Sequence, residues 1–233
     1  MGLFSKRKQP AAAPAVRTID ELVVVDVPGW KKIDGYLNES SLRNEVVPFD
    51  DDRRRAVLAG LQVTVASGMG ALVWNCAAIL VDHGWVRLLG SGVGDLPPIH
   101  MEQLSVPGSS SFEGVVVAYD VLGGVFAVHG HGFTADPGEI CYWAPDTLDW
   151  TPLGFGHFTL IEFLLSDGLA EFYSDLRWDG WESDTDALVA DQGISAYPFP
   201  FSAEGRPGND VSRTPAPLAE VVRAGFEFAA QLG

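Results

Sequence analysis

Cysteine is nearly absent from this sequence, whose 233 residues contain only Cys76 and Cys141. Two cysteines are too few for the disulfide framework of a small secreted protein. Both lie inside apolar runs, which is typical of buried thiols, and a disulfide or a shared metal is the alternative. This cysteine usage favours a reducing compartment, and we predict a cytoplasmic protein.

Long apolar runs are also missing, and none approaches the roughly 18 residues that a membrane-spanning helix needs. The first residues, MGLFSKRKQP, are basic, but Pro and Ala follow them instead of the apolar core of a secretory signal. Lys6 stands where a myristoylation motif needs Ser or Thr. We expect no membrane association, a flexible basic tail at residues 1–17 and one domain at residues 18–233.

Basic residues are scarce outside that tail. The chain has 15 Lys and Arg against 31 Asp and Glu, a net charge of −16, and four of the cations fall in the first 17 residues, which leaves −20 on the other 216. Because phosphate contacts supply most nucleic-acid affinity, such a body excludes DNA and RNA as partners. It would attract a basic protein, or it serves only solubility.

The sequence also lacks a nucleophile elbow, a Walker A loop, a dinucleotide-binding fingerprint and an HExxH motif. The run Gly90-Ser-Gly92-Val-Gly94 is only superficially like a phosphate loop, because Pro97 and Pro98 follow it instead of a helix start. No catalytic constellation is complete, and nothing predicts a cofactor.

The order of the expected elements indicates an α+β fold with a mainly antiparallel central sheet and helices at both ends. Helices are predicted after Thr18, over 30–42, from Asp50 to Leu61, from about Thr159, and after Pro217. Thr18-x-x-Glu21 and Thr159-x-x-Glu162 each match a capping box at the start of a helix. Strands are predicted near 71–75, 78–82, 85–89, 115–119, 125–129, 140–143 and 150. Residues 96–111 and 192–214 read as loops, because they are rich in Pro, Gly and Ser.

Two turns carry candidate binding residues. In the first, a carboxylate next to a histidine suits general-base chemistry and an arginine could hold an anion, whereas the alternative is a tight structural turn. The second is a glycine turn between two strands, and the two together could form the mouth of a small-molecule pocket. The residues are Asp82, His83, Trp85 and Arg87 in the first turn, and Asp120, Gly123 and Gly124 in the second.

His129 and His131 form the sharpest metal candidate. On a strand, side chains two residues apart point to the same face, and Asp136 and Glu139 follow closely. A metal-dependent enzyme built on these four residues is therefore one alternative. The other is a pair of solvated histidines in a turn.

Several motifs make the chain resemble the DUF2625 family of uncharacterised bacterial proteins over residues 18–233. They are Ser67-x-Met69-Gly70-Ala71, Asp82-His83-Gly84-Trp85-x-Arg87, Asp120-Val-Leu-Gly123-Gly124-x-Phe126-Ala127, Tyr142-x-Ala144-Pro145-Asp146 and Phe172-Tyr173-x-x-Leu176-Arg177-Trp178-x-Gly180-Trp181. The family implies a cytosolic bacterial protein and supplies no catalytic residues. The order of elements from Gly124 to Leu165 more loosely resembles the SUKH (Smi1/Knr4-like) superfamily, whose bacterial members include immunity proteins that bind toxins.

The most favoured reading is a non-catalytic protein-interaction module that binds a basic partner. The acids between residues 175 and 186 are too dense to be buried unpaired, and they lie beside tryptophans, which are frequent in binding hot spots. The predicted contact residues are Asp175, Trp178, Asp179 and Trp181. A metal-dependent enzyme and a small-molecule-binding protein are the alternatives, and the sequence does not indicate an oligomeric state.

Overall fold

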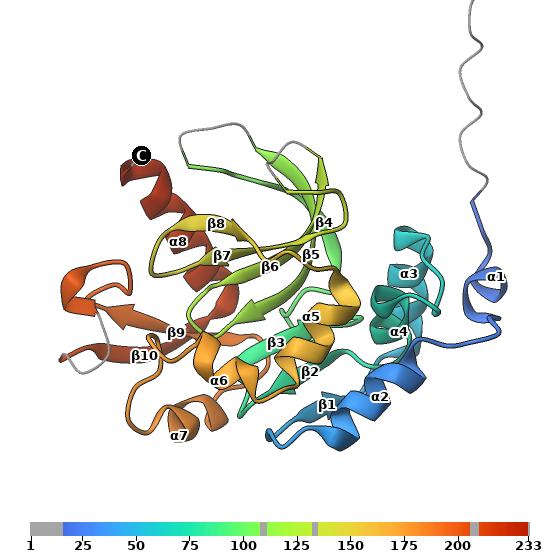
Figure 1. The fold of residues 1–233 in the computed structure, drawn as a ribbon, viewed down its shortest axis with the longest axis horizontal. Coiled ribbons are helices and arrows are strands. Elements are labelled where there is room, and N and C mark those ends of the chain that lie inside the picture. The colour runs from blue at the N-terminus through green and yellow to red at the C-terminus, as the bar shows by residue number, and fades with distance from the viewer. Residues whose placement is uncertain (1–15, 108–110, 132–134, 206–209, 233) are drawn as a thin grey trace, which may run out of the picture.

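A computed structural model of the protein describes residues 16–107, 111–131, 135–205 and 210–232 (Figure 1). The predicted tail at residues 1–17 lies almost wholly outside this part of the chain. The fold is α+β with a large antiparallel sheet, as the sequence predicted. Within the described residues no helix is long and apolar enough to cross a membrane.

The large sheet has eight strands in the order β1-β2-β3-β5-β6-β7-β8, and β4 pairs with β5. Every pairing in it is antiparallel, and short turns join β2 to β3, β5 to β6 and β7 to β8. Its strands are β1 (Glu45–Val47), β2 (Ala78–Val81), β3 (Val86–Leu89), β4 (His100–Leu104), β5 (Phe112–Asp120), β6 (Val125–His131), β7 (Ile140–Ala144) and β8 (Asp149–Pro152).

One row of side chains crosses five strands in register. It runs through Arg87, Tyr119, Val125, Trp143 and Trp150. Residues paired across antiparallel strands point to the same side of a sheet, so this row marks one face. The last helix, α8 (Leu218–Leu232), covers that face, where Phe226 stacks on Trp143 with ring centroids 4.4 Å apart.

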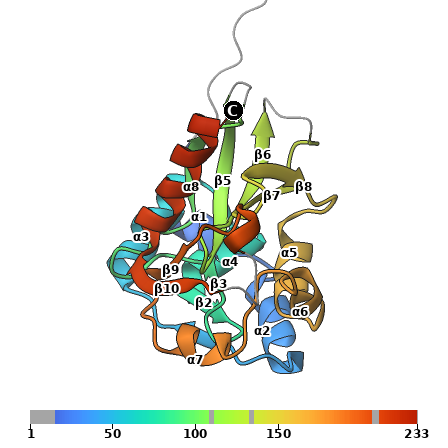
Figure 2. The ribbon, with the colours of Figure 1, turned by 90° about the vertical axis from the view of Figure 1, so that its left-hand side faces the viewer.

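The opposite face is covered by α5 (His157–Leu164) and α6 (Gly168–Phe172), and Figure 2 shows these helices and α8 on opposite sides of β5 and β6. Phe126 and Tyr142 stack here at 4.5 Å, and Phe172 meets Tyr142 edge-on at 5.1 Å. Aromatic pairs at these distances add to the stability gained from burial alone. The sheet is therefore a middle layer with a covered face on each side.

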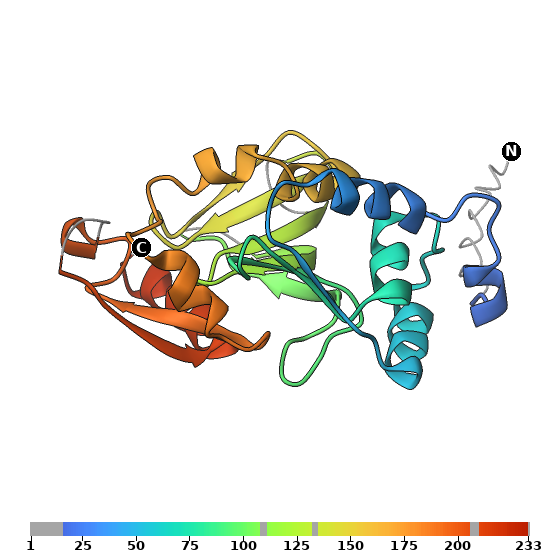
Figure 3. The same ribbon diagram turned by 90° about the horizontal axis from the view of Figure 1, so that it is seen from below.

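Four helices precede the central strands: α1 (Ile19–Val23), α2 (Trp30–Glu39), α3 (Asp51–Leu61) and α4 (Gly68–Asn75). They gather at one end of the molecule (Figure 3). Thr18 and Glu21 form the predicted capping box at α1, and Asp50 caps α3 by accepting a hydrogen bond from the Arg53 backbone N–H at 2.8 Å. Both helix starts were predictable from these polar residues.

The strand predicted near residues 71–75 is wrong, because this segment is the second half of α4. The Ser67 hydroxyl accepts a hydrogen bond from the Gly70 backbone N–H at 3.1 Å and so begins a helix. Residues Ala71, Leu72 and Val73 are all buried. A short run that is apolar on every side has no period that distinguishes a strand from a buried helix.

The two predicted loops are also partly wrong. Residues 96–111 contain β4, and residues 192–214 contain β9 (Gln192–Tyr197) and the start of β10 (Ser212–Pro217), which form a separate two-stranded antiparallel sheet. Strand pairing therefore overrides the loop-forming composition. The remaining short elements are the helix α7 (Trp181–Asp186) and a 3₁₀ turn at Ala203–Gly205.

The helix predicted near Thr159 exists, but it begins at His157 after an N-cap at Gly156. The predicted capping box there is wrong. The Glu162 carboxylate instead accepts a hydrogen bond from the Tyr36 hydroxyl at 2.8 Å, which connects α5 to α2.

Candidate ligand-binding site

The turn between β5 and β6 is built around the fully buried carboxylate of Asp120. Its Oδ1 accepts hydrogen bonds from the backbone N–H groups of Leu122 at 2.9 Å and Gly124 at 2.8 Å. Its Oδ2 accepts from the hydroxyls of Tyr142 at 2.6 Å and Tyr173 at 3.1 Å. Burial raises the pKa of Asp120, and these four hydrogen bonds oppose that rise.

Neither glycine of this turn leaves room for a larger side chain. A methyl group on Gly124 would lie 1.9 Å from Asp120 Oδ2. Gly123 has φ of +91°, and a methyl group there would lie 3.1 Å from the Val221 side chain on α8. The turn is therefore closed by its own contacts, and its polar groups are used to hold β7 and α6.

The turn between β2 and β3 is equally occupied by contacts within the chain. Asp82 accepts a hydrogen bond from Arg177 Nη2 at 2.6 Å, and the Arg177 guanidinium lies 3.9 Å from the ring centroid of Trp181 and 5.1 Å from that of Trp85. His83 Nδ1 lies 3.1 Å from Asp186 Oδ2. These contacts join the turn to α7 and to the segment before it.

Arg87 is buried in the middle of β3, and its donors point to backbone carbonyls. Nη2 donates to Gln192 O at 2.7 Å, Nε donates to Ala190 O at 3.4 Å, and Nη1 donates to Gly84 O. Burial lowers the pKa of Arg87 to about 10, although Asp120 opposes this. Arg87 connects the sheet to the segment before β9, so its guanidinium is not presented to an external anion.

The predicted acidic edge is exposed, but its tryptophans pack inward. Asp175, Asp179, Glu182, Asp184 and Asp186 are all exposed. The Trp178 side chain is only 9% exposed, and its Nε1–H donates to Asp184 at 2.7 Å. Trp181 is half-buried against Arg177. The structure brings the predicted residues together at one edge, and binding of a basic partner there stays a prediction.

The predicted metal residues lie at the end of β6 and in the following turn. His129 is 3% exposed, and its ring lies 5.5 Å from that of Phe112. The Glu139 carboxylate accepts backbone hydrogen bonds from Asp136 at 3.0 Å and from Gly154 at 2.6 Å. The side chain of His131 lies outside the described residues, so the metal prediction remains untested. Where side chains are described, no three His, Cys, Asp or Glu residues cluster to hold a metal.

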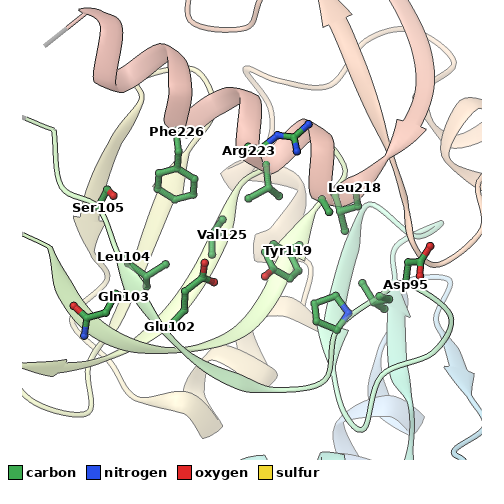
Figure 4. A pocket seen from close by; sticks show the side chains of 14 residues that line it. Asp95, Glu102, Gln103, Leu104, Ser105, Tyr119, Val125, Leu218, Arg223 and Phe226 are labelled. Carbon is green, nitrogen blue, oxygen red and sulfur yellow. The ribbon is translucent and has the colours of Figure 1, made fainter.

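A cavity that the sequence did not indicate lies elsewhere, between α8 and the face of the sheet that carries the Tyr119 row. Its volume is about 360 Å³. We call it the α8 cavity, and Figure 4 shows its lining. It is lined by Leu218, Ala219, Val222, Arg223 and Phe226 of α8, by Tyr119 and Val125 of the sheet, by residues 102–105 at the end of β4, and by residues 95–97 of the preceding loop.

The helix side of this cavity is apolar because Leu218, Val222 and Phe226 recur every four residues and so share one face of α8. The sheet side presents Val125 and the ring of Tyr119. Leu104 adds a further apolar wall at the end of β4. These walls suit an apolar ligand body.

Polar groups converge at one side of the cavity. Tyr119 is 7% exposed, and its hydroxyl makes no hydrogen bond to any described residue. In Figure 4 the Glu102 carboxylate and the Tyr119 hydroxyl lie on facing sides of the same space. Burial raises the pKa of Tyr119, and the nearby charge of Glu102 raises it further.

No motif in the sequence indicates this cavity. The run His100-Met-Glu-Gln-Leu104 lacks the alternation of a half-buried strand and lies in a Pro/Gly/Ser-rich segment, so its sequence predicts a loop. Tyr119 was placed on a strand without a function. The repeat of Leu218, Val222 and Phe226 was the available signal for the helix wall.

The fold and the cavity together define the class: an α+β protein whose antiparallel sheet is covered on both faces and leaves a cavity beneath its last helix. The chain belongs to the family described as "Protein of unknown function DUF2625", whose model matches residues 19–221. This confirms the family predicted from the sequence motifs.

Two relatives are similar over most of their length. One is "Putative uncharacterized protein YbfG" of Escherichia coli (strain K12), 33% identical over 201 residues, which are 85% of this chain and 93% of the relative. The other is an "Uncharacterized protein" of Haemophilus influenzae, 29% identical over 181 residues, which are 76% of this chain and 79% of the relative. No solved structure matches the chain, and the SUKH resemblance stays a prediction.

Proposed function

We propose that this protein binds a small organic molecule in the α8 cavity. The observation that carries the proposal is the cavity itself, whose volume of about 360 Å³ falls within the range of about 300–1,000 Å³ that small-molecule sites occupy. Such sites combine mostly apolar walls with a few polar groups that orient the ligand. The α8 cavity has this composition.

The two turns predicted to form the mouth of a pocket, β2–β3 and β5–β6, do not line the α8 cavity. Their residues instead pack against the elements that form its walls. The Asp120 turn lies against α8 through Gly123 and Val221, and Arg87 stands beside Tyr119 in the same cross-strand row. These buried contacts hold both walls of the cavity at a fixed separation. A preformed cavity costs less ordering on binding than one that must be assembled.

Binding of a basic protein at the acidic edge is a separate prediction that the exposed carboxylates support. It lacks the exposed aromatic anchor that interfaces commonly use, since Trp178 and Trp181 contact their own chain. A cytoplasmic location also stays a prediction. The cavity offers the more specific hypothesis and the sharper test.

The test is a screen of small fragments by two-dimensional NMR on the ¹⁵N-labelled full chain. Fragments of about ten heavy atoms bind in the millimolar to micromolar range, so we expect hits at millimolar concentration. Their amide shifts should concentrate at Tyr119, Val125 and residues 102–105. Val222→Trp fills the cavity and should abolish the shifts.

Ala230→Trp is the matched control, because Ala230 is an exposed residue of the same helix that does not line the cavity. It should retain every hit. If Val222→Trp does not fold, Ala219→Trp at the rim takes its place. Hits that persist in the filled variants, or a screen without any hit near these residues, would refute the proposal.

A further inference from the structure

We infer that the ligand of the α8 cavity is a small organic cation, an ammonium group carried on an apolar or aromatic body. This inference rests on the proposed function and specifies its ligand class. It starts from the charges that line the cavity. Asp95 and Glu102 contribute two carboxylates, and Arg223 is the single cation in the lining.

The positive charge of Arg223 is directed to solvent. Its side chain is 69% exposed, and its Nε lies 3.6 Å from Glu227 Oε1, one turn further along α8. Glu227 does not line the cavity. Arg223 is therefore already paired on the outer side of the helix, and its charge does not balance the carboxylates on the other side of the cavity.

Within the described residues neither carboxylate pairs with a Lys or Arg side chain, and Glu102 lies within ion-pair distance of His100, which is charged only when it is protonated. Asp95 makes no ion pair there, and its backbone N–H donates to another carboxylate, that of Asp191, at 3.1 Å. Glu102 Oε2 lies 3.2 Å from His100 Nε2, which leaves Oε1 without a hydrogen bond to the described chain. The net charge of −16 adds a negative field over the whole protein.

The Tyr119 hydroxyl completes the recognition site. It is an acceptor as well as a donor, it has no hydrogen-bond partner among the described residues, and it faces Glu102. An ammonium group has three N–H donors and no acceptor, so it can satisfy both oxygens at once. A ligand carboxylate would instead meet Glu102 and Asp95 with like charge.

The remaining wall defines the ligand body. Phe226 is held in place by stacking on Trp143 at 4.4 Å and contributes its ring to the cavity beside Val222 and Leu104. A flat apolar body that extends from the ammonium group would contact these three side chains. The aromatic rings of Tyr119 and Phe226 also favour a cation nearby.

Three probes with one apolar body and different charge test the inference: 2-phenylethylamine, 2-phenylethanol and 3-phenylpropionate. NMR titration of the full chain at pH 7.5 and low salt should show the amine binding about tenfold more tightly than the alcohol, as a charge-assisted hydrogen bond predicts. The acid should bind more weakly than the alcohol. The shifts should again centre on Tyr119 and residues 102–105.

Glu102→Gln keeps the shape of the side chain and removes its charge. We expect it to reduce amine affinity to that of the alcohol while alcohol affinity stays unchanged. Glu113→Gln is the control, because Glu113 is an exposed acid on β5 that does not line the cavity, and it should keep the tenfold preference.

The outcomes separate the two proposals. If the alcohol or the acid binds as tightly as the amine, and Val222→Trp abolishes that binding, the inference of a cationic ligand is refuted. The proposal that the α8 cavity binds a small molecule is then retained. An amine preference that survives Glu102→Gln also overturns the inference. If no probe and no screened fragment shifts the cavity residues, the proposed function fails as well.

Discussion

Gly124→Ala should be among the most destabilising small substitutions in the protein. The added methyl group would lie 1.9 Å from Asp120 Oδ2 and 2.7 Å from the Tyr142 hydroxyl, where neither atom can remain. The carboxylate cannot move freely, because four hydrogen bonds fix it. Its displacement would first break the two tyrosine hydrogen bonds at Oδ2.

The expected cost follows from those two bonds. A hydrogen bond to a charged group contributes about 1.5–3 kcal/mol, so losing both predicts a loss of about 3–6 kcal/mol in the free energy of unfolding. For a chain of this size about 1 kcal/mol corresponds to roughly 2–4 °C, so Tm should fall by about 10 °C. Urea unfolding followed by tryptophan fluorescence measures the free energy of unfolding, and thermal unfolding followed by circular dichroism measures Tm.

Gly60→Ala is the matched control. Gly60 lies inside α3 with no atom within 4 Å of an added methyl group, so alanine should stabilise the helix by up to about 1 kcal/mol. Both changes restrict the unfolded chain in the same way, so the difference between them isolates the contact at Asp120. Asp120→Asn should cost less than Gly124→Ala, because it keeps the shape of the side chain. A Gly124→Ala protein within about 1 kcal/mol of wild type would refute this account of the turn.

Two further predictions concern buried titratable groups. Both ring nitrogens of His157 are buried without a partner in the described chain, and burial lowers its pKa to about 4. The unfolded chain therefore binds a proton below about pH 6.5 that the folded chain rejects until about pH 4, so this contribution to stability falls as pH drops through that window. Unfolding of wild type and His157→Phe at pH 7 and 4.5 should show about 2 kcal/mol less acid loss in the variant, and parallel curves would contradict the assignment. Burial also raises the pKa of Cys76 and of Cys141 to about 12, so neither thiol should react with Ellman's reagent at pH 8 until denaturant is added, and rapid native labelling would show that the thiols are accessible.

Local polar chemistry made much of the fold predictable. The hairpin centred on Gly123 and Gly124 was expected, and β5, β6 and β7 follow it in the predicted order. The capping residues Thr18 and Asp50 placed two helix starts correctly. Each of these signals depends on residues within about five positions, which is why sequence alone could show them.

Elements whose secondary structure depends on distant partners could not be predicted from the sequence. The segment at 71–75 belongs to a helix that is apolar on every side because it is buried by the close approach of α2, α3 and α5. β4 is a strand because it pairs with β5, as the register of Met101 with Val115 shows. Neither close approach leaves a pattern within its own segment.

The cavity shows the same division between local and distant information. The helix wall follows a local rule, the four-residue apolar repeat on α8, whereas the walls on β4 and around Tyr119 depend on strand pairing. Their meeting depends on where α8 crosses the sheet, and the Phe226 stack on Trp143 and the contact of Gly123 with Val221 determine that position. Both contacts join residues about 80 to 100 positions apart in the sequence. The polar residues that looked functional in the sequence, Asp120 and Arg87, make buried contacts within the chain, whereas Glu102 and Tyr119, which line the cavity, belong to no sequence motif. In this chain, then, the recognisable motifs belong to residues that stabilise the fold around the cavity, and the proposed site is lined by residues outside those motifs.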